Sequence, residues 1–78
     1  MLTVNNPRIK VLVEAIKKGP IEDINFSVVK ENGLSIIVSH DSDDVTAKQV
    51  MKKYIADNAE MKRYFTSVMI CDENGRIK

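Results

Sequence analysis

The dipeptide Asn32-Gly33 lies between two runs in which apolar and polar residues alternate, and no other feature constrains the fold as strongly. Asn-Gly in this setting is the strongest short-range signal for a β-hairpin, because both residues accept the left-handed backbone of a tight turn. The pattern therefore predicts one strand over residues 22–30 and a second over residues 34–40.

Two turns compete for this hairpin, and they orient the strands differently. A two-residue loop, Asn32-Gly33, pairs Glu31 with Leu34, whereas a three-residue loop, Glu31-Asn32-Gly33, pairs Lys30 with Leu34. The two registers differ by one residue, which turns one strand's side chains to the other face. Only the three-residue loop collects the large apolar residues on one face. Because burying apolar surface is worth roughly 25 cal/mol per Å², we favour the three-residue loop.

The preferred register divides the hairpin into a core face and an outer face. We expect the core face to carry Ile24, Phe26, Val28, Leu34, Ile36 and Val38. The outer face then carries Asn25, Ser27, Val29, Ser35, Ile37 and Ser39. Val29 and Ile37 are the only large apolar side chains that this arrangement leaves on the outer face.

One helix is predicted on each side of the hairpin in the sequence. The first follows Asn6, a favourable N-cap, with Pro7 at its first position, and it stops at Gly19-Pro20. The second spans residues 45–58 and follows the acidic, helix-capping residues 40–44. Each helix has one apolar stripe at helical spacing. The stripes comprise Ile9, Leu12, Val13 and Ile16 in the first helix, and Ala47, Val50, Met51, Tyr54 and Ile55 in the second.

The two ends of the chain are less well defined by their sequence. In residues 1–6, the alternation of Leu2 and Val4 fits either a short edge strand or a segment packed beneath the first helix. Residues 64–72 predict a third strand, and a Glu-Asn-Gly turn follows, so residues 76–78 leave room only for a very short fourth strand.

Residues 1–78 are therefore expected to form a single small α+β domain with the order α-β-β-α-β and a possible final β. A two-layer sandwich, with a mostly antiparallel sheet and both helices on one face, buries each apolar stripe once. A chain of 78 residues has a marginal core, which makes self-association a reasonable expectation.

The acidic residues Asp41, Asp43 and Asp44 raise the possibility of a metal site. An EF-hand loop that begins at Asp41 requires glycine at its sixth position and glutamate at its twelfth, where this chain has Thr46 and Lys52. We therefore interpret the three carboxylates as helix-capping groups, and whether they do more is left open. No cofactor is expected, because the three glycines are isolated and form no phosphate-binding loop.

Enzymatic activity is the least favoured class of function. His40 is the only histidine, and the sole candidate nucleophile, Cys71, lies far from it in the sequence. We expect His40 to be exposed at a strand end and Cys71 to be a small packed residue. A lone cysteine excludes an intrachain disulfide, and there is no signal peptide and no apolar run long enough to span a membrane, so a cytoplasmic location is expected.

Two binding functions remain. The first is a protein-interaction module, most simply a homodimer, that uses an open sheet face around Val29, Ile37, Ser27 and Ser35, or an unpaired sheet edge. The alternative is a small nucleic-acid-binding protein that uses the basic second helix. Its candidate contacts are Lys48, Lys52, Lys53, Lys62 and Arg63. The formal net charge of +1 shows no basic excess of the kind that marks dedicated nucleic-acid binders, which favours the first function.

Overall fold

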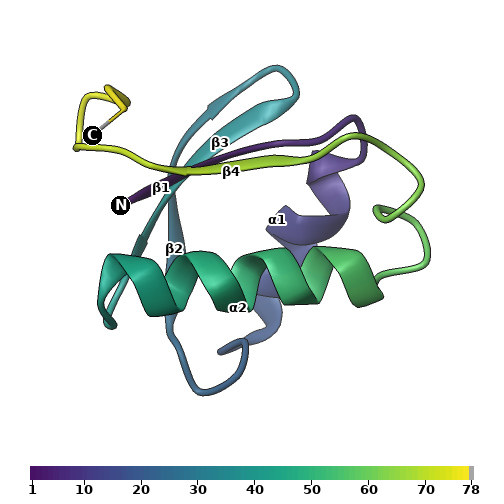
Figure 1. Cartoon of the computed structure of the whole chain (residues 1–78), viewed down its shortest axis with the longest axis horizontal. Coiled ribbons are helices and arrows are strands. Elements are labelled where there is room, and N and C mark those ends of the chain that lie inside the picture. Colours follow the sequence, from purple (N-terminus) through teal and green to yellow (C-terminus); the bar gives the residue numbers. More distant parts are fainter. Residues whose placement is uncertain (78) are drawn as a thin grey trace.

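Six regular elements build the fold of residues 1–77, which are the residues that the computed structural model describes (Figure 1). They are β1 (Leu2–Asn5), α1 (Ile9–Lys18), β2 (Phe26–Asn32), β3 (Ser35–His40), α2 (Asp44–Asp57) and β4 (Ser67–Ile70). The strands form one antiparallel sheet in the order β2-β3-β1-β4. Both helices pack on the same face of this sheet, which confirms the predicted two-layer α+β fold (Figure 1).

The N-terminal residues form a central strand of the sheet. β1 pairs with β3 on one side and with β4 on the other, so that Leu2 lies between Val38 and Ile70. The expectation of an edge strand was therefore wrong, whereas Leu2 and Val4 do pack in the core with the apolar stripe of α1. The order β-α-β-β-α-β with β1 and β3 at the centre is the split β-α-β arrangement of ferredoxin-like folds. This arrangement carries many unrelated functions, so it specifies none here.

The β2–β3 hairpin is present, but its turn differs from both predicted turns. Asn32 pairs with Ser35, so the two turn residues are Gly33 and Leu34. Gly33 has a φ of +65°, and the positive φ at the first central position alone is the pattern of a type II′ turn. The predicted pairing of Lys30 with Leu34 and the core position of Leu34 were therefore wrong. Leu34 is exposed, and its carbonyl oxygen accepts a hydrogen bond from the Asn6 amide at 3.0 Å.

A β-bulge at Val29 preserves the predicted core face despite the different turn. Lys30 pairs with Ile37, but the next pair along the hairpin joins Val28 to Val38, so Val29 has no partner. One extra residue changes the register by one and returns the alternate side chains to their expected faces. Phe26, Ile36 and Val38 are accordingly buried, and Val28 is partly buried.

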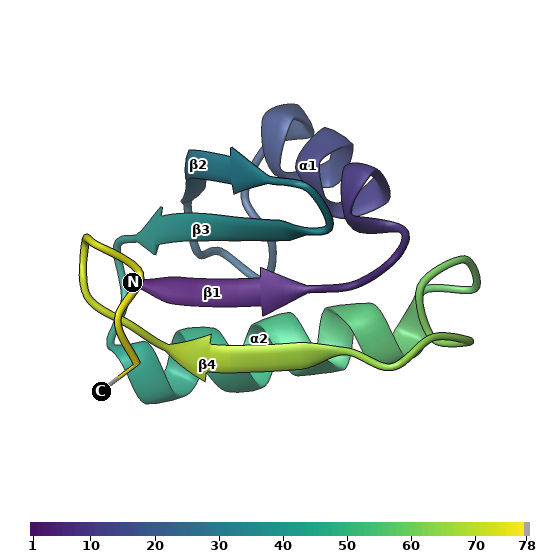
Figure 2. The same ribbon diagram turned by 90° about the horizontal axis from the view of Figure 1, so that it is seen from above.

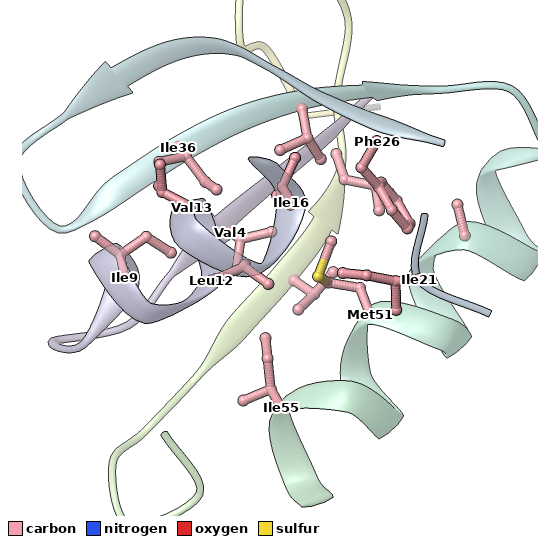
Figure 3. Packing of buried hydrophobic residues seen from close by; sticks show 14 of the residues in the cluster. Val4, Ile9, Leu12, Val13, Ile16, Ile21, Phe26, Ile36, Met51 and Ile55 are labelled. Atoms are coloured by element: carbon pink, nitrogen blue, oxygen red, sulfur yellow. The ribbon is translucent and has the colours of Figure 1, made fainter. Parts of the chain in front are cut away.

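The core fills the space between the sheet and the two helices (Figure 3). From α1 it receives the predicted stripe, and from α2 it receives Ala47, Met51 and Ile55, while Val50 and Tyr54 are partly buried at its margin. On the sheet side, Leu2 and Val4 of the central strand β1 are fully buried. The helical apolar periodicity therefore predicted which face of each helix is buried.

Among residues 1–77, Asn6 is the only polar or charged residue that is buried as a whole, with 1% of its surface exposed. The helix begins at Ile9 with Arg8 as its N-cap residue, so the predictions of Asn6 as the N-cap and Pro7 as the first helical residue were wrong. Asn6 Oδ1 accepts the Arg8 amide at 2.7 Å, and its backbone oxygen accepts the Ile9 amide. Its Nδ2 donates to the carbonyl oxygen of Met61 and to the hydroxyl of Thr66. Asn6 thus connects the start of α1 to the segment between α2 and β4.

Replacement of Asn6 by alanine is expected to destabilise the protein by about 2–3 kcal/mol, because buried backbone groups that bond to this side chain lose their partners. Urea denaturation followed by circular dichroism measures this change. Asn5→Ala is the matched control, since Asn5 is the exposed neighbour and its replacement should change stability by less than about 0.5 kcal/mol. Equal effects of both substitutions would contradict the role assigned to Asn6.

The segment between α1 and β2 contains a tight turn where the sequence predicted the start of a strand. Ile21 and Ile24 exchange two backbone hydrogen bonds of 3.0 Å, and both side chains are buried. The two residues between them, Glu22 and Asp23, have φ values of 51° and 65°. Positive φ at both central positions is the pattern of a type I′ turn, which favours Asn and Gly rather than Glu and Asp. β2 therefore begins only at Phe26.

Asp23→Gly is expected to stabilise the protein by about 0.5–1 kcal/mol, because glycine adopts the positive φ at this position without steric cost. For a domain of this size that gain corresponds to a rise of roughly 3–6 °C in the melting temperature. Thermal unfolding monitored by circular dichroism measures it. A decrease in the melting temperature would contradict this expectation, because it would show that the Asp23 side chain stabilises the folded protein by more than its backbone strain destabilises it.

The C-terminal part of the chain contains less regular secondary structure than predicted. β4 spans Ser67–Ile70 rather than residues 64–72, and residues 58–66 form a series of turns. After Cys71 the chain reverses at Gly75, and an isolated antiparallel bridge joins Cys71 to Ile77. This bridge takes the place of the very short final strand, and Lys78 lies outside the described residues.

Candidate functional site

The sheet face opposite the helices has no covering layer of helices or strands (Figure 2). Its middle row runs across the sheet, because Thr3 of β1 pairs with both Ile37 of β3 and Met69 of β4. Lys30 continues the row on β2. Met69 is 41% exposed, and Ile37 is partly buried. We call this surface, comprising the outward side chains of the four strands, the open face.

The C-terminal turn covers part of the open face at Ile37. A Cβ atom at Gly75 would lie 3.0 Å from Cδ1 of Ile37, so the backbone of the turn is in close contact with that side chain. A hollow of about 200 Å³ lies between Asn74, Gly75 and the strands, and polar groups from Thr3, Asn32 and Ser35 line it. The turn therefore leaves Val29 and Met69, rather than Ile37, as the more accessible apolar groups.

The four predicted interface residues all lie on the β2–β3 hairpin, but they differ in how exposed they are. Val29, the bulged residue, is 50% exposed, and Ser27 is exposed, whereas Ser35 and Ile37 are partly buried. Met69 and Thr3 complete the row with Ile37, but they were not among the predicted residues. Recognising Met69 requires the pairing of β4 with β1, which joins residues far apart in the sequence.

The predicted basic residues do not form one continuous patch. Lys48 and Lys52 lie one turn apart on α2, and Lys52 lines the same groove as Lys62, which follows the helix. Arg63 instead lines a depression with Arg8 and Glu60, and Lys53 lines neither. The structure thus brings Lys52 and Lys62 to one groove, with Lys48 one helical turn from Lys52, whereas Arg63 lines a different depression.

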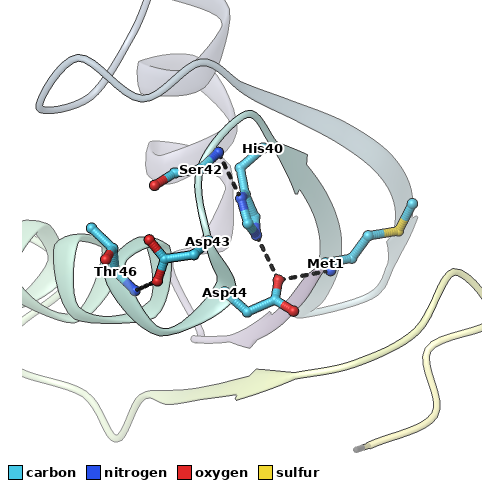
Figure 4. A network of polar contacts seen from close by, with 6 residues as sticks. All are labelled: Met1, His40, Ser42, Asp43, Asp44 and Thr46. Carbon is cyan, nitrogen blue, oxygen red and sulfur yellow. Dashed lines mark hydrogen bonds and ion pairs between the residues drawn. The ribbon is translucent and has the colours of Figure 1, made fainter.

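His40 and Asp44 form a hydrogen-bonded pair at the start of α2 (Figure 4). His40 Nε2 lies 2.8 Å from Asp44 Oδ1, and His40 Nδ1 accepts the Ser42 amide at 3.3 Å. Since Nδ1 accepts, the hydrogen of the neutral ring lies on Nε2 and is donated to Asp44. Only 4% of the His40 side chain is exposed, and its ring packs edge-to-face with that of Phe26, with the ring centroids 6.1 Å apart. The expectation of an exposed histidine was therefore wrong.

The three acidic residues make separate contacts. Asp43 is the N-cap of α2 and accepts the Thr46 amide at 2.9 Å, as predicted. Asp41 accepts both the backbone and side-chain N–H groups of Asn25, which joins the start of β2 to the loop before α2. Asp44 also accepts a hydrogen bond from the amino group of Met1. Among residues 1–77, no group of three or more His, Cys, Asp or Glu side chains could hold a metal ion.

Hydrogen bonding lowers the pKa of each of these carboxyl groups below 3.8. For Asp44 the principal cause is the hydrogen bond from His40, followed by that from the amino group of Met1. A lowered pKa in the folded state means that the stabilising effect is complete above the ordinary value of 3.8. It is lost as the pH falls through the folded-state pKa.

We therefore expect Asp44→Asn to reduce the stability of the protein at neutral pH and to make its unfolding less sensitive to acid below pH 3.8. Urea midpoints measured across the acid range for the variant and the wild type should converge as the pH falls. Asp57→Asn is the control at the exposed end of the same helix. A constant difference between the Asp44 variant and the wild type at every pH would contradict this account.

Comparisons of the chain with protein-family models, with curated proteins and with solved structures find no match. No helix within the described residues has the length and apolar character needed to cross a membrane. The candidate site is therefore argued from the geometry of the chain itself.

Proposed function

We propose that the protein is a non-enzymatic protein-interaction domain that forms a homodimer through the open face of its sheet. The observation that carries this proposal is that both helices cover one face, while half-exposed apolar side chains lie on the other. A second copy would bury Val29 and Met69 together with the polar serine and threonine side chains around them. Apolar groups surrounded by polar ones are the usual composition of such interfaces.

The area required for a dimer is compatible with this face. A specific interface buries about 800 Å² on each partner, which is roughly one sixth of the 4956 Å² surface of this protein. The C-terminal turn packs against Ile37 on this face, so a partner that covers the face contacts the turn as well as the strands. The C-terminal turn would then be part of the interface, with Ile77, which is also half-exposed, at its margin.

The β2 edge is less suited to self-association than the open face. It carries the bulge at Val29 and the charged residues Lys30 and Glu31, which are features that protect edge strands from pairing with other chains. The proposed dimer therefore stacks two sheets face to face rather than extending one sheet through β2.

Nucleic-acid binding is the second candidate function. In its favour, Lys52 and Lys62 line one groove together with the ring of Tyr64, and base stacking on aromatic rings is a common mode of single-strand recognition. Against it, Phe26 is the only aromatic residue in the four strands, and its side chain is buried on the helical side of the sheet. An aromatic sheet face of the kind that binds RNA is thus missing from residues 1–77.

The dimer is expected to dissociate when charge is introduced on the open face. Val29→Glu and Met69→Glu should each weaken self-association by about tenfold or more, because an unpaired charge would be buried in the interface. Sedimentation equilibrium over a range of concentrations measures the association constant. Val45→Glu is the matched control, since Val45 is also an exposed apolar residue but lies on α2. A monomeric wild-type protein at the highest concentration would contradict the proposal.

A further inference from the structure

A groove of about 360 Å³ separates the second half of α2 from the outer edge of the sheet at β4. Ile55 and Ala56 of α2 line one side, and Val68 of β4 lines the other. Lys52 and Lys62 also line this groove, and both side chains are exposed. We call this feature the α2–β4 groove.

The backbone of β4 has unpaired groups beside this groove. Cys71 donates its amide to Met1, the residue before β1, so the N–H of Cys71 points toward β1. In an antiparallel pair, alternate residues direct their N–H and C=O groups to opposite sides. Val68 and Ile70 therefore direct these groups away from β1, toward the outer edge. In residues 1–77, β4 pairs with no strand other than β1.

The chain itself places an antiparallel partner at this edge immediately after β4. The Asp72 amide points away from β1, opposite to the amide of Cys71, and donates to the carbonyl oxygen of Arg76 at 2.9 Å. The bridge between Cys71 and Ile77 belongs to the same short pairing. This edge is therefore compatible with an added strand at Val68, while the C-terminal turn already pairs with the chain around Cys71.

The charge and exposure of the surrounding residues indicate what kind of segment would bind. No acidic side chain lines the α2–β4 groove, and within the described residues neither Lys52 nor Lys62 forms an ion pair. Tyr64, which lines the groove, is 46% exposed, and Phe65, two residues before β4 in the sequence, is 87% exposed. Exposed aromatic and cationic groups around an apolar groove are typical of peptide-binding surfaces.

We propose that the α2–β4 groove binds an extended, acidic segment of a partner protein, which adds to β4 as a fifth strand of the sheet. Its backbone bonds to Val68, and an apolar side chain enters the groove beside Ile55. Its carboxylates pair with Lys52 and Lys62. This site is separate from the open face, so it does not depend on the proposed dimer.

The test uses a fluorescein-labelled peptide of about eight residues, in which Asp or Glu alternates with Val or Leu; this length spans β4 with short flanks. Fluorescence anisotropy should show saturable binding to the wild-type protein. Lys52→Glu and Lys62→Glu should each weaken binding by about fivefold or more, because an attractive charge pair becomes a repulsive one. Lys53→Glu is the matched control, since Lys53 is exposed on the same helix but does not line the groove.

Two further peptides separate strand addition from general charge attraction. A peptide with proline at its centre keeps the charges but loses a backbone donor, so it should not bind. A peptide with lysine in place of the acidic residues should not bind either. Binding of the proline peptide with unchanged affinity, or an equal loss of affinity in the Lys52 and Lys53 variants, would overturn the proposal.

The other possible occupants of the groove give different results in the same experiment. A single-stranded oligonucleotide that competes with the acidic peptide and binds more tightly would assign the groove to nucleic acid and overturn the proposal. A change in the sedimentation of the protein alone on Lys52→Glu would assign the groove to a second copy of the chain, which also overturns it. The dimer is measured separately by Val29→Glu, so failure of one proposal is distinguishable from failure of the other.

Discussion

The buried side chain of Asn6 holds together parts of the chain that are distant in the sequence. It bonds to the start of α1 through Arg8, to the turn after α2 through Met61, and to the approach to β4 through Thr66. Its backbone amide donates to Leu34 in the hairpin turn. A buried amide is stabilising only when its hydrogen-bonding groups are satisfied, so each of these segments must take up its observed position for the fold to form.

The hairpin turn is also joined to Asn6, through the backbone. The Asn32-Gly33 signal indicated a hairpin correctly, but the turn is centred on Gly33 and Leu34, where the carbonyl oxygen of Leu34 meets the amide of Asn6. The apolar pattern required Phe26 and Ile36 to share one face, and the bulge at Val29 reconciles that requirement with the shifted turn. The same bulge exposes Val29 and makes the β2 edge unsuitable for pairing.

Both candidate surfaces are parts of the sheet that the two helices do not cover. Both helices cover one face of the sheet, so Val29 and Met69 are exposed on the other face. The α2–β4 groove lies between α2 and the outer edge of the sheet. The charged residues that stand out in the sequence have structural roles instead. Asp41, Asp43 and Asp44 bond to Asn25, to the α2 N-terminus and to His40, and they organise the entry into that helix.

The sequence alone determined the secondary structure of the hairpin and helices, and also the buried side of each, because these depend on the local spacing of apolar residues along one segment. It also identified Val29 and Ile37 as outward-facing apolar residues. It did not predict that β1 would be central or that Met69 would lie beside Thr3, since strand pairing joins residues far apart in the chain. Nor did it place Lys52 and Lys62 at one groove, or bury His40. Only the tertiary structure decides such positions, because they depend on which elements pack against each other.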